Sequence, residues 1–326
     1  MRKEVDNRGH GRRMTAVLQI IKLLGRLPLA ARRRALRLLW RGTLPFRSEV
    51  GFGLQPVVEH YLKVGRKAAQ RIAVEHDYHD TLLIMEWHAN IHRSRRQLIG
   101  DSARTRVNDP ALIERIAASG DTVILAPIHM GVFPSGITHV VWKYFAGRRL
   151  LVLRARDDLA ENNAAMDRLR DVASEFRILN TRNEADFVDA MRFARKGGVV
   201  VSLLDLPETY GIPADTTLFG EPAAIALGLD AMARMLKAVV VPMTVRSLQS
   251  RDEIVFGQPF EVSATSPEAR QELARAIARQ IEVFVKIAPP QWHMWTRLPE
   301  FYPERVRRRT PDASPDAGKV EAHVGL

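Results

Sequence analysis

Two residues suited to proton transfer each lie at the end of an apolar run. His129 closes TVILAPIH at 122–129, and Asp205 lies near the end of VVVSLLDL at 199–206. Ligands of open α/β sheets bind beyond the carboxyl ends of the strands, and a histidine there titrates in a range that suits general acid–base work. We predict that His129 is a general base and that Asp205 assists it from the same crevice. The alternatives are an ordinary structural histidine and an aspartate that caps the following loop.

Three further residues near strand ends are candidate contacts for a substrate. Gly131 lets the backbone approach a ligand closely, and its N–H is predicted to stabilise an oxyanion. Arg154 and Arg156 end the next apolar run. Arginines in that position suit a phosphate or a developing oxyanion. The competing interpretation of both arginines is ordinary surface charge.

The sequence lacks the residues that several kinds of chemistry require. The chain contains no cysteine, which excludes disulfides, thiolate metal sites and a cysteine nucleophile. It also lacks a G-x-S-x-G elbow and the glycine patterns that bind phosphates. A covalent intermediate on the protein is therefore poorly supported. Direct attack by an acceptor hydroxyl, with His129 removing the proton, requires no protein nucleophile.

Two histidine pairs have spacings that would suit a metal on a helix. They are His76 with His79, and His88 with His92. The region offers no His-Glu zinc signature, and histidines are common on helical faces. We therefore expect neither a metal nor an ordinary cofactor.

The elements that would position these residues alternate between strands and helices. We predict strands at 121–129, 148–156, 176–180, 199–206, 239–246 and 253–262. We predict helices at 110–119, 161–177, 184–198, 225–238 and 267–288, with further helices within 57–100. This alternation is typical of an α/β fold with a mostly parallel central sheet and helices on both faces. An N-terminal helical region completes the predicted fold.

The predicted organisation has four parts along the chain. Residues 1–13 are a disordered basic lead-in, and residues 14–108 form a helical region with amphipathic, membrane-associating helices. Residues 109–302 form the α/β core. Residues 303–326 are rich in proline and charge and are predicted to be a disordered tail.

The charge of the chain points to an anionic partner. The formal net charge is +12, and lysines and arginines greatly outnumber acids in the first fifty residues. Nucleic acid, anionic lipid headgroups and an acidic carrier protein are all compatible with this charge. Nucleic acid is not expected, because the basic residues are not interleaved with aromatic ones and no recognition motif is present.

The N-terminal region favours attachment to a membrane surface. The apolar run at 16–24 reaches only about 14 Å, too short for a ~30 Å hydrocarbon layer. Residues 29–41 place Leu29, Leu36, Leu39 and Trp40 near one helical face, with arginines elsewhere around it. A basic amphipathic helix of this kind is typical of an interfacial anchor. For residues 29–41, the alternative is a packing helix with a solvated basic face. For the apolar run at 16–24, the alternative is a signal peptide, but no small-x-small cleavage site follows the run before Pro28.

Five segments, taken in order, resemble the lauroyl/myristoyl (late) acyltransferases of lipid A biosynthesis, within the lysophospholipid acyltransferase-like group. The resemblance runs from about Leu24 to Phe301. The segments are LLGRLPLAARRRALRLLWRG, TVILAPIHMG, RARDDLAENNAAMDRLR, the stretch from KGGVVVSLLDL through LFGEPAAIALG to VVVPMTVR, and APPQWHMWTRLPEFY. Each segment is weak evidence alone, but five in the right order are fairly specific.

The resemblance implies a reaction and a location. It implies transfer of a fatty acyl chain from acyl carrier protein or coenzyme A, as co-substrate, to a hydroxyl or amine of a lipid or glycolipid acceptor. It also implies an enzyme at the cytoplasmic face of the bacterial inner membrane, peripheral or anchored by its N-terminal helices. The expected partners are acyl carrier protein, anionic membrane lipids and the lipid acceptor.

One position departs from the family pattern. The family motif is a histidine, four residues and then an aspartate or glutamate, but Pro134 stands where the acid belongs. A proline can neither orient the imidazole nor stabilise its cation. Three accounts remain open: His129 acts alone or with Asp205, the substrate differs from lipid A, or the protein is a non-catalytic homologue that binds acyl carrier protein or lipid.

An apolar channel for the acyl chain is also predicted. We expect Phe219 and the helix at 225–235 to help form its wall. Packing in the core is the alternative for each of these residues.

Overall fold

The computed structural model describes residues 18–47, 50–154, 170, 173–180 and 186–307. The predicted lead-in, Arg156 and most of the helix predicted at 161–177 lie outside the described residues. The tail is predicted at 303–326, and from residue 308 onward it also lies outside the described residues. Before that point, Glu304–Arg307 form the short helix α12, whose Val306 is buried.

A mostly parallel sheet forms the centre of the described part of the chain, as the sequence predicts. Its strands lie in the order β1 (Arg106–Val107), β9 (Asp252–Phe256), β8 (Val239–Ser247), β2 (Val123–Pro127), β5 (Val199–Val201), β3 (Leu150–Arg154) and β4 (Phe176–Asn180). Neighbouring strands pair in parallel except β8 and β9, which are antiparallel. The carboxyl ends of β2, β5 and β3 therefore meet at one edge of the sheet.

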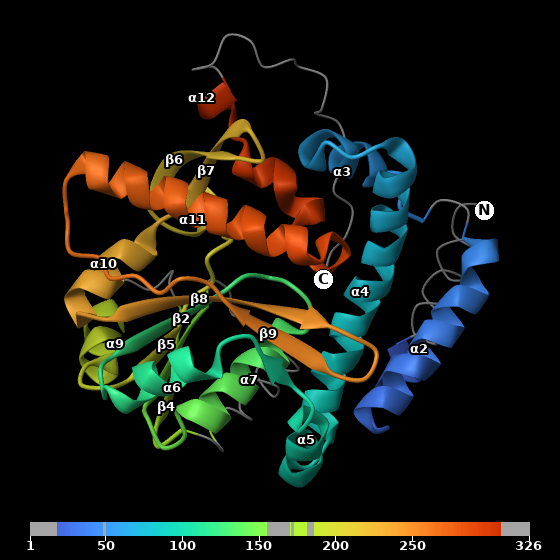
Figure 1. The fold of residues 1–326 in the computed structure, drawn as a ribbon, viewed down its shortest axis with the longest axis horizontal. Helices are drawn as coiled ribbons and strands as arrows, with labels where there is room; N and C mark the ends of the chain where they lie inside the picture. Colours follow the sequence, from blue (N-terminus) through green and yellow to red (C-terminus); the bar gives the residue numbers. More distant parts are fainter. Residues whose placement is uncertain (1–17, 48–49, 155–169, 171–172, 181–185, 308–326) are drawn as a thin grey trace, which may run out of the picture.

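Helices cover both faces of this sheet (Figure 1). On one face lie α9 (Phe187–Ala194), α10 (Gly228–Leu236) and α11 (Pro267–Ile287), and on the other lie α6 (Pro110–Ala118) and α7 (Phe133–Tyr144). Strand β2 shows how the sequence produces two cores. Val123 and Leu125 point into the core shared with α6 and α7, whereas Ile124 and Ala126 point into the opposite core.

A hairpin that the sequence analysis missed lies above the sheet. Strands β6 (Pro213–Leu218) and β7 (Glu221–Ala226) pair antiparallel around Phe219 and Gly220, which both have positive φ as in a type I′ turn. Proline, aspartate and alanine are poor strand formers, so the local sequence reads as a loop. Contacts with α11 stabilise the hairpin. The predicted helix at 225–238 accordingly begins only at Gly228.

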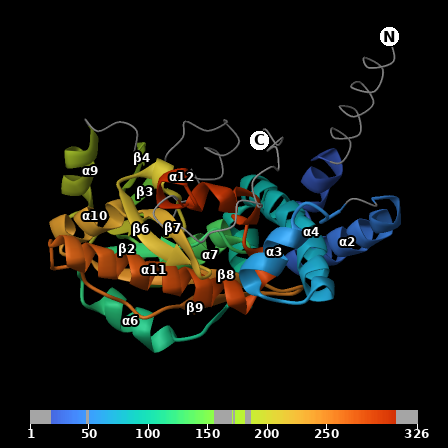
Figure 2. The ribbon, with the colours of Figure 1, turned by 90° about the horizontal axis from the view of Figure 1, so that it is seen from above.

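The N-terminal helices stand beside one end of the sheet (Figures 1 and 2). They are α2 (Leu29–Thr43), α3 (Gln55–Leu62), α4 (Arg66–His92) and α5 (Arg95–Ser102), and residues 18–24 are also helical. Four 3₁₀ turns complete the described elements: η1 (Leu44–Phe46), η4 (Glu208–Tyr210), η5 (Pro289–Gln291) and η6 (Trp295–Phe301). Among the described residues, no helix is long and apolar enough to span a membrane.

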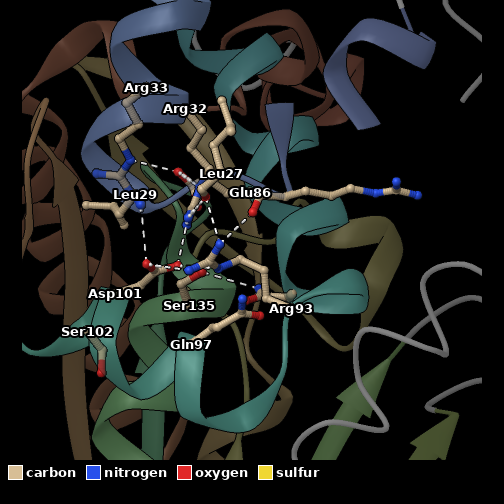
Figure 3. Close-up of polar contacts among 12 residues, drawn as sticks. Leu27, Leu29, Arg32, Arg33, Glu86, Arg93, Gln97, Asp101, Ser102 and Ser135 are labelled. Atoms are coloured by element: carbon tan, nitrogen blue, oxygen red, sulfur yellow. Dashed lines mark hydrogen bonds and ion pairs between the residues drawn. The ribbon is translucent and has the colours of Figure 1, made fainter. Parts of the chain in front are cut away.

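Buried ion pairs fix α2 to the rest of the molecule (Figure 3). Arg32 and Arg33 are only 2% and 0% exposed, although the sequence analysis placed them away from the apolar face. The guanidinium groups of both arginines bond to the Glu86 carboxylate of α4. Arg32 also reaches Asp101 of α5 at 2.7 Å, and Arg33 reaches Asp252 of β9 at 2.8 Å.

This burial corrects the predicted faces of the helix at 29–41. Leu29, Leu36 and Trp40 are buried as expected, but Leu39 is 49% exposed. The helical period alone predicts that the arginines are exposed to solvent. It carries no information about carboxylates from distant parts of the chain that can neutralise buried arginines. Three acids supplied by α4, α5 and β9 make the burial of two arginines possible.

Candidate active site

His129 and Asp205 form a hydrogen-bonded pair at the carboxyl edge of the sheet. The Nδ1 atom of His129 lies 2.9 Å from Oδ1 of Asp205, and the backbone N–H of His129 donates to Oδ2 at 2.8 Å. Asp205 is completely buried, whereas the His129 side chain is 21% exposed. The pair therefore presents an imidazole to the surface and keeps its carboxylate partner out of water.

The sheet register brings these two residues together. Leu125 of β2 pairs with Val201 of β5, and the Leu204 N–H donates to the Pro127 carbonyl at 2.8 Å. The segment after β5 thus continues alongside the segment after β2. Asp205 lies in this loop, four residues beyond the last residue of β5, which corrects its predicted place at the strand end.

The bond to Asp205 determines which imidazole nitrogen is free to accept a proton. An ionised carboxylate only accepts hydrogen bonds, so Nδ1 of a neutral His129 carries the hydrogen and Nε2 carries a lone pair. Within the described residues, no hydrogen bond to Nε2 is found. The Phe133 ring packs against the imidazole at 5.2 Å between centroids. This arrangement suits a general base that takes a proton from a ligand at Nε2.

Pro134 does not disturb this pair. It lies in the first turn of α7, where a missing N–H leaves no hydrogen bond unmade. Its carbonyl accepts a hydrogen bond from the Thr138 hydroxyl at 2.9 Å. The imidazole therefore has a carboxylate partner, but from the segment after β5 and not from the motif position.

Close packing at position 131 leaves no room for a side chain, and the Gly131 N–H already donates a hydrogen bond within the protein. Its φ is +58°, and an added Cβ would lie 2.3 Å from the Val245 carbonyl oxygen. The N–H donates to the Gln291 carbonyl at 2.9 Å. In this structure the C-terminal segment accepts the hydrogen bond from this donor, and the role of the N–H toward an oxyanion stays a prediction.

A short segment, the Gln291–His293 strap, holds the loop that carries His129. The Gln291 side chain accepts the Ser247 N–H at 2.7 Å and donates to the Ser247 carbonyl at 2.9 Å. The Trp292 indole N–H donates to Oδ2 of Asp205 at 2.8 Å, and the His293 N–H donates to the His129 carbonyl at 2.8 Å. The sequence by itself predicts no role for these residues. Their only signal is their place in APPQWHMWTRLPEFY at 288–302, one of the five segments that carry the family resemblance.

A second histidine–carboxylate pair lies on the other side of the same loop. His293 Nδ1 is 2.6 Å from an Asp80 carboxylate oxygen, and His293 Nε2 is 2.9 Å from the Gly131 carbonyl. Both partners are acceptors, so each ring nitrogen of His293 faces an oxygen that can accept a hydrogen bond. Burial raises the pKa of Asp80, but the hydrogen bond from His293 and the charge of His76 outweigh it and lower that pKa.

The histidines considered for a metal have other surroundings. His76 lies 3.1 Å from the Pro290 carbonyl, and burial lowers the pKa of His79 to about 3, so His79 is neutral. The His88 and His92 rings stack at 6.4 Å. Among the described residues, no group of three or more histidines and acids has the arrangement of a metal site.

The remaining predicted site residues are Arg154, Arg156 and Phe219. Arg154 ends β3, two strands from β2 in the sheet order, and it has other interaction partners. Arg156 lies outside the described residues. Phe219 is 5% exposed, and its ring stacks on Trp295 at 5.8 Å and meets Trp292 at 5.7 Å. Phe219 therefore packs in the core, which is the alternative to its predicted place in a channel wall.

A pocket on the outer side of α7 is distinct from this site. It is lined by α4, α5 and α7, and it includes Asn90, Ser135, His139 and Trp142 but neither His129 nor Asp205. Burial, aided by the charge of Lys143, lowers the pKa of His139 to about 4. His139 is therefore neutral, and neither of its ring nitrogens has a hydrogen-bond partner among the described residues.

A family comparison covers the His129–Asp205 pair and the strap. Residues 85–298 match the family model described as bacterial lipid A biosynthesis acyltransferase. The protein belongs to this family. The resemblance found in the sequence is thereby confirmed, and the protein has an acyltransferase activity of the lipid A type. A search of curated proteins finds no match. The family span contains His129, Asp205 and the strap, whereas α2 and α3 precede it.

Proposed function

We propose that this family member moves a fatty acyl chain from acyl carrier protein or coenzyme A to a hydroxyl or amine of a lipid or glycolipid acceptor. His129 is the general base, and Asp205 orients it. The single observation that carries the proposal is the 2.9 Å contact between His129 and a buried Asp205 at the carboxyl edge of the sheet. It gives the imidazole a carboxylate partner although the motif acid is Pro134.

The proposed reaction needs no covalent intermediate with the protein. The acceptor hydroxyl gives its proton to Nε2 of His129 while its oxygen bonds to the thioester carbonyl carbon. The tetrahedral intermediate then collapses, and its carbon–sulfur bond breaks. The departing thiolate takes the proton from the imidazolium, so a free thiol and an acylated lipid are released. Asp205 stabilises the imidazolium throughout, without itself becoming protonated.

The negative charge that develops on the carbonyl oxygen requires a counter-charge. We assign this role to Arg154, with Arg156 beside it in the sequence. An arginine at the carboxyl end of β3 shares a sheet edge with His129 and Asp205. A guanidinium also suits the phosphates of a carrier or a lipid headgroup.

We propose that the protein acts at the cytoplasmic face of the inner membrane, with its N-terminal helices against the lipid surface. Within the described residues, this region exposes more than half of the side chain of Leu23, Leu38, Phe46 and Phe52. Arginines on the same segments are also exposed, namely Arg26, Arg34 and Arg41. Apolar side chains among basic ones favour binding to anionic lipids.

The catalytic proposal is tested by following thioester consumption. The purified protein is incubated with acyl carrier protein carrying chains of several lengths, or with acyl-coenzyme A, and with bacterial lipid extract. Lipid products are identified by mass spectrometry. We expect an acylated lipid from the wild type and from His92→Ala, which changes an exposed histidine of α4, but none from His129→Ala. Equal turnover by His129→Ala would refute the assignment of the base.

The same assay distinguishes an enzyme from a non-catalytic homologue. If the wild type transfers no acyl group where a known acyltransferase does, the catalytic proposal fails. Binding of acyl carrier protein that is unchanged in His129→Ala would then identify a carrier-binding protein.

The membrane proposal is tested by sedimentation with vesicles. We expect binding to vesicles that contain phosphatidylglycerol, and weaker binding by the double variant Leu38→Ser/Phe46→Ser. The control is Val283→Ser, which changes an exposed apolar residue of α11. Equal binding by both variants would refute a role for the N-terminal region.

A further inference from the structure

We propose that Trp292 is a positioning residue, which holds the Asp205 carboxylate in the orientation that fixes the protonation of His129. The inference rests on the proposed function, because it assigns a task to Trp292 within the same site. It goes beyond that proposal by placing part of the acid–base machinery in the C-terminal strap.

The first support is the distribution of hydrogen bonds on Asp205. Oδ1 faces Nδ1 of His129, whereas Oδ2 accepts both the His129 backbone N–H and the Trp292 indole N–H, each at 2.8 Å. A carboxylate held by one bond on each oxygen can still rotate about its χ2 torsion, which is broad and soft. A third donor on Oδ2 opposes that rotation and keeps Oδ1 directed at Nδ1.

The second support is burial. Asp205 and Trp292 are both 0% exposed, so water does not reach this carboxylate to replace a lost donor. A buried carboxylate needs hydrogen bonds from the protein, and bonds to an ionised group are stronger than those between neutral groups. The indole N–H therefore supplies Asp205 with a hydrogen bond that water is not there to replace.

The third support is the rigid setting of the indole. Trp295 meets the Trp292 ring edge-on at 4.9 Å, and Phe219 and Phe301 lie 5.7 and 6.3 Å away. A backbone bridge between Met130 and Trp292 ties the strap to the loop that carries His129. Packing thus leaves the indole one orientation, with its N–H on the carboxylate.

This arrangement has a consequence for the tautomer of His129. A firmly oriented Asp205 keeps the hydrogen on Nδ1 and the lone pair on Nε2, where the acceptor is bound. When the carboxylate rotates away, the Nε2–H tautomer becomes populated and cannot take a proton from the acceptor. Trp292 therefore acts on the turnover rate and not on the binding of either substrate.

The test compares Trp292→Phe with Trp295→Phe. Both variants replace a buried indole of the same aromatic cluster by a smaller ring and remove one N–H. The N–H of Trp295 donates to the Pro289 carbonyl at 2.7 Å and does not touch Asp205. Any loss due to packing therefore falls on both variants, whereas loss of the carboxylate contact falls on Trp292→Phe alone.

Two measurements are made on each full-length variant. We expect kcat of Trp292→Phe to fall about tenfold with KM within twofold, the order expected for losing one hydrogen bond to a charged group. In ¹⁵N-histidine NMR, with the His129 signals assigned from His129→Gln, we expect the Nε2–H tautomer to appear in Trp292→Phe only. His293 and Asp80, the other titratable pair at this loop, are unchanged in both variants.

The outcomes separate the inference from the proposed function. Equal losses of kcat and of melting temperature in the two variants would show that Trp292 only packs the core. An unchanged His129 tautomer in Trp292→Phe would also overturn the inference. If the wild type transfers no acyl group but the tautomer responds to Trp292→Phe alone, the positioning role stands and the proposed reaction fails.

Discussion

The buried ion pairs around Glu86 make the stability of the protein depend strongly on one carboxylate. Glu86 is 2% exposed and bonds to Arg32 and Arg33, which are equally inaccessible to water. We consider Glu86→Gln, which keeps the shape of the side chain but removes its charge. The variant leaves two buried guanidinium groups with too little compensating charge.

The expected loss follows from the burial of the pairs. Removing one partner of a buried ion pair typically lowers the free energy of unfolding by about 3–5 kcal/mol. In a chain of this size, such a loss lowers the melting temperature by roughly 4–8 °C. The matched control is Glu75→Gln, since Glu75 pairs with Arg37 where both side chains are 22–30% exposed. A partly exposed ion pair of this kind contributes about 1 kcal/mol or less to the free energy of unfolding.

The pH dependence provides a second check. Burial raises the pKa of Glu86, but the charges and hydrogen bonds of Arg33 and Arg32 outweigh it and lower that pKa below 4.5. A carboxyl whose pKa is lower in the folded state stabilises the fold at pH values above its unfolded pKa. This contribution is lost as the pH falls through the folded pKa. The difference between wild type and Glu86→Gln should therefore be constant above pH 4.5 and narrow below it.

Urea unfolding, followed by circular dichroism at several pH values, measures the free energies of unfolding, and thermal unfolding measures the melting temperatures. The reasoning is refuted if Glu86→Gln lowers the free energy of unfolding by no more than Glu75→Gln at pH 7. It is also refuted if the difference between wild type and Glu86→Gln grows as the pH falls below 4.5.

Two other substitutions test the site itself. Asp205→Asn should lower kcat by at least about 100-fold, because an amide that donates to Nδ1 favours the wrong tautomer of His129. Steady-state kinetics with acyl carrier protein measure this, and a loss under threefold would contradict the role of Asp205. Gly131→Ala should lower the free energy of unfolding by about 2 kcal/mol or more, because its Cβ would meet the Val245 carbonyl at 2.3 Å. The control is Gly147→Ala, which should lower the free energy of unfolding, measured with urea, by only about 1–2 kcal/mol. Gly147 also has a positive φ, but no described atom lies within 4 Å of an added Cβ. Equal losses in the two glycine variants would contradict the packing argument.

The sequence by itself determined the class of fold and the place of the histidine. Apolar runs such as 123–127 and 199–201, separated by amphipathic stretches, are sufficient to predict a parallel sheet between helices. His129 follows the first of these runs, and chain order alone puts it at the carboxyl edge of the sheet. The family signature in the sequence was confirmed by the match over 85–298.

The tertiary structure decided which distant side chains meet. Asp205 is 76 residues from His129, and Trp292 is a further 87 residues along the chain. Periodicity reports which face of an element is apolar, but it does not report which carboxylate or indole arrives at a strand end. The same limit explains the buried Arg32 and Arg33, because their burial depends on acids that are more than fifty residues away. It also explains the hairpin at 213–226, whose weak strand formers pair because α11 packs against them.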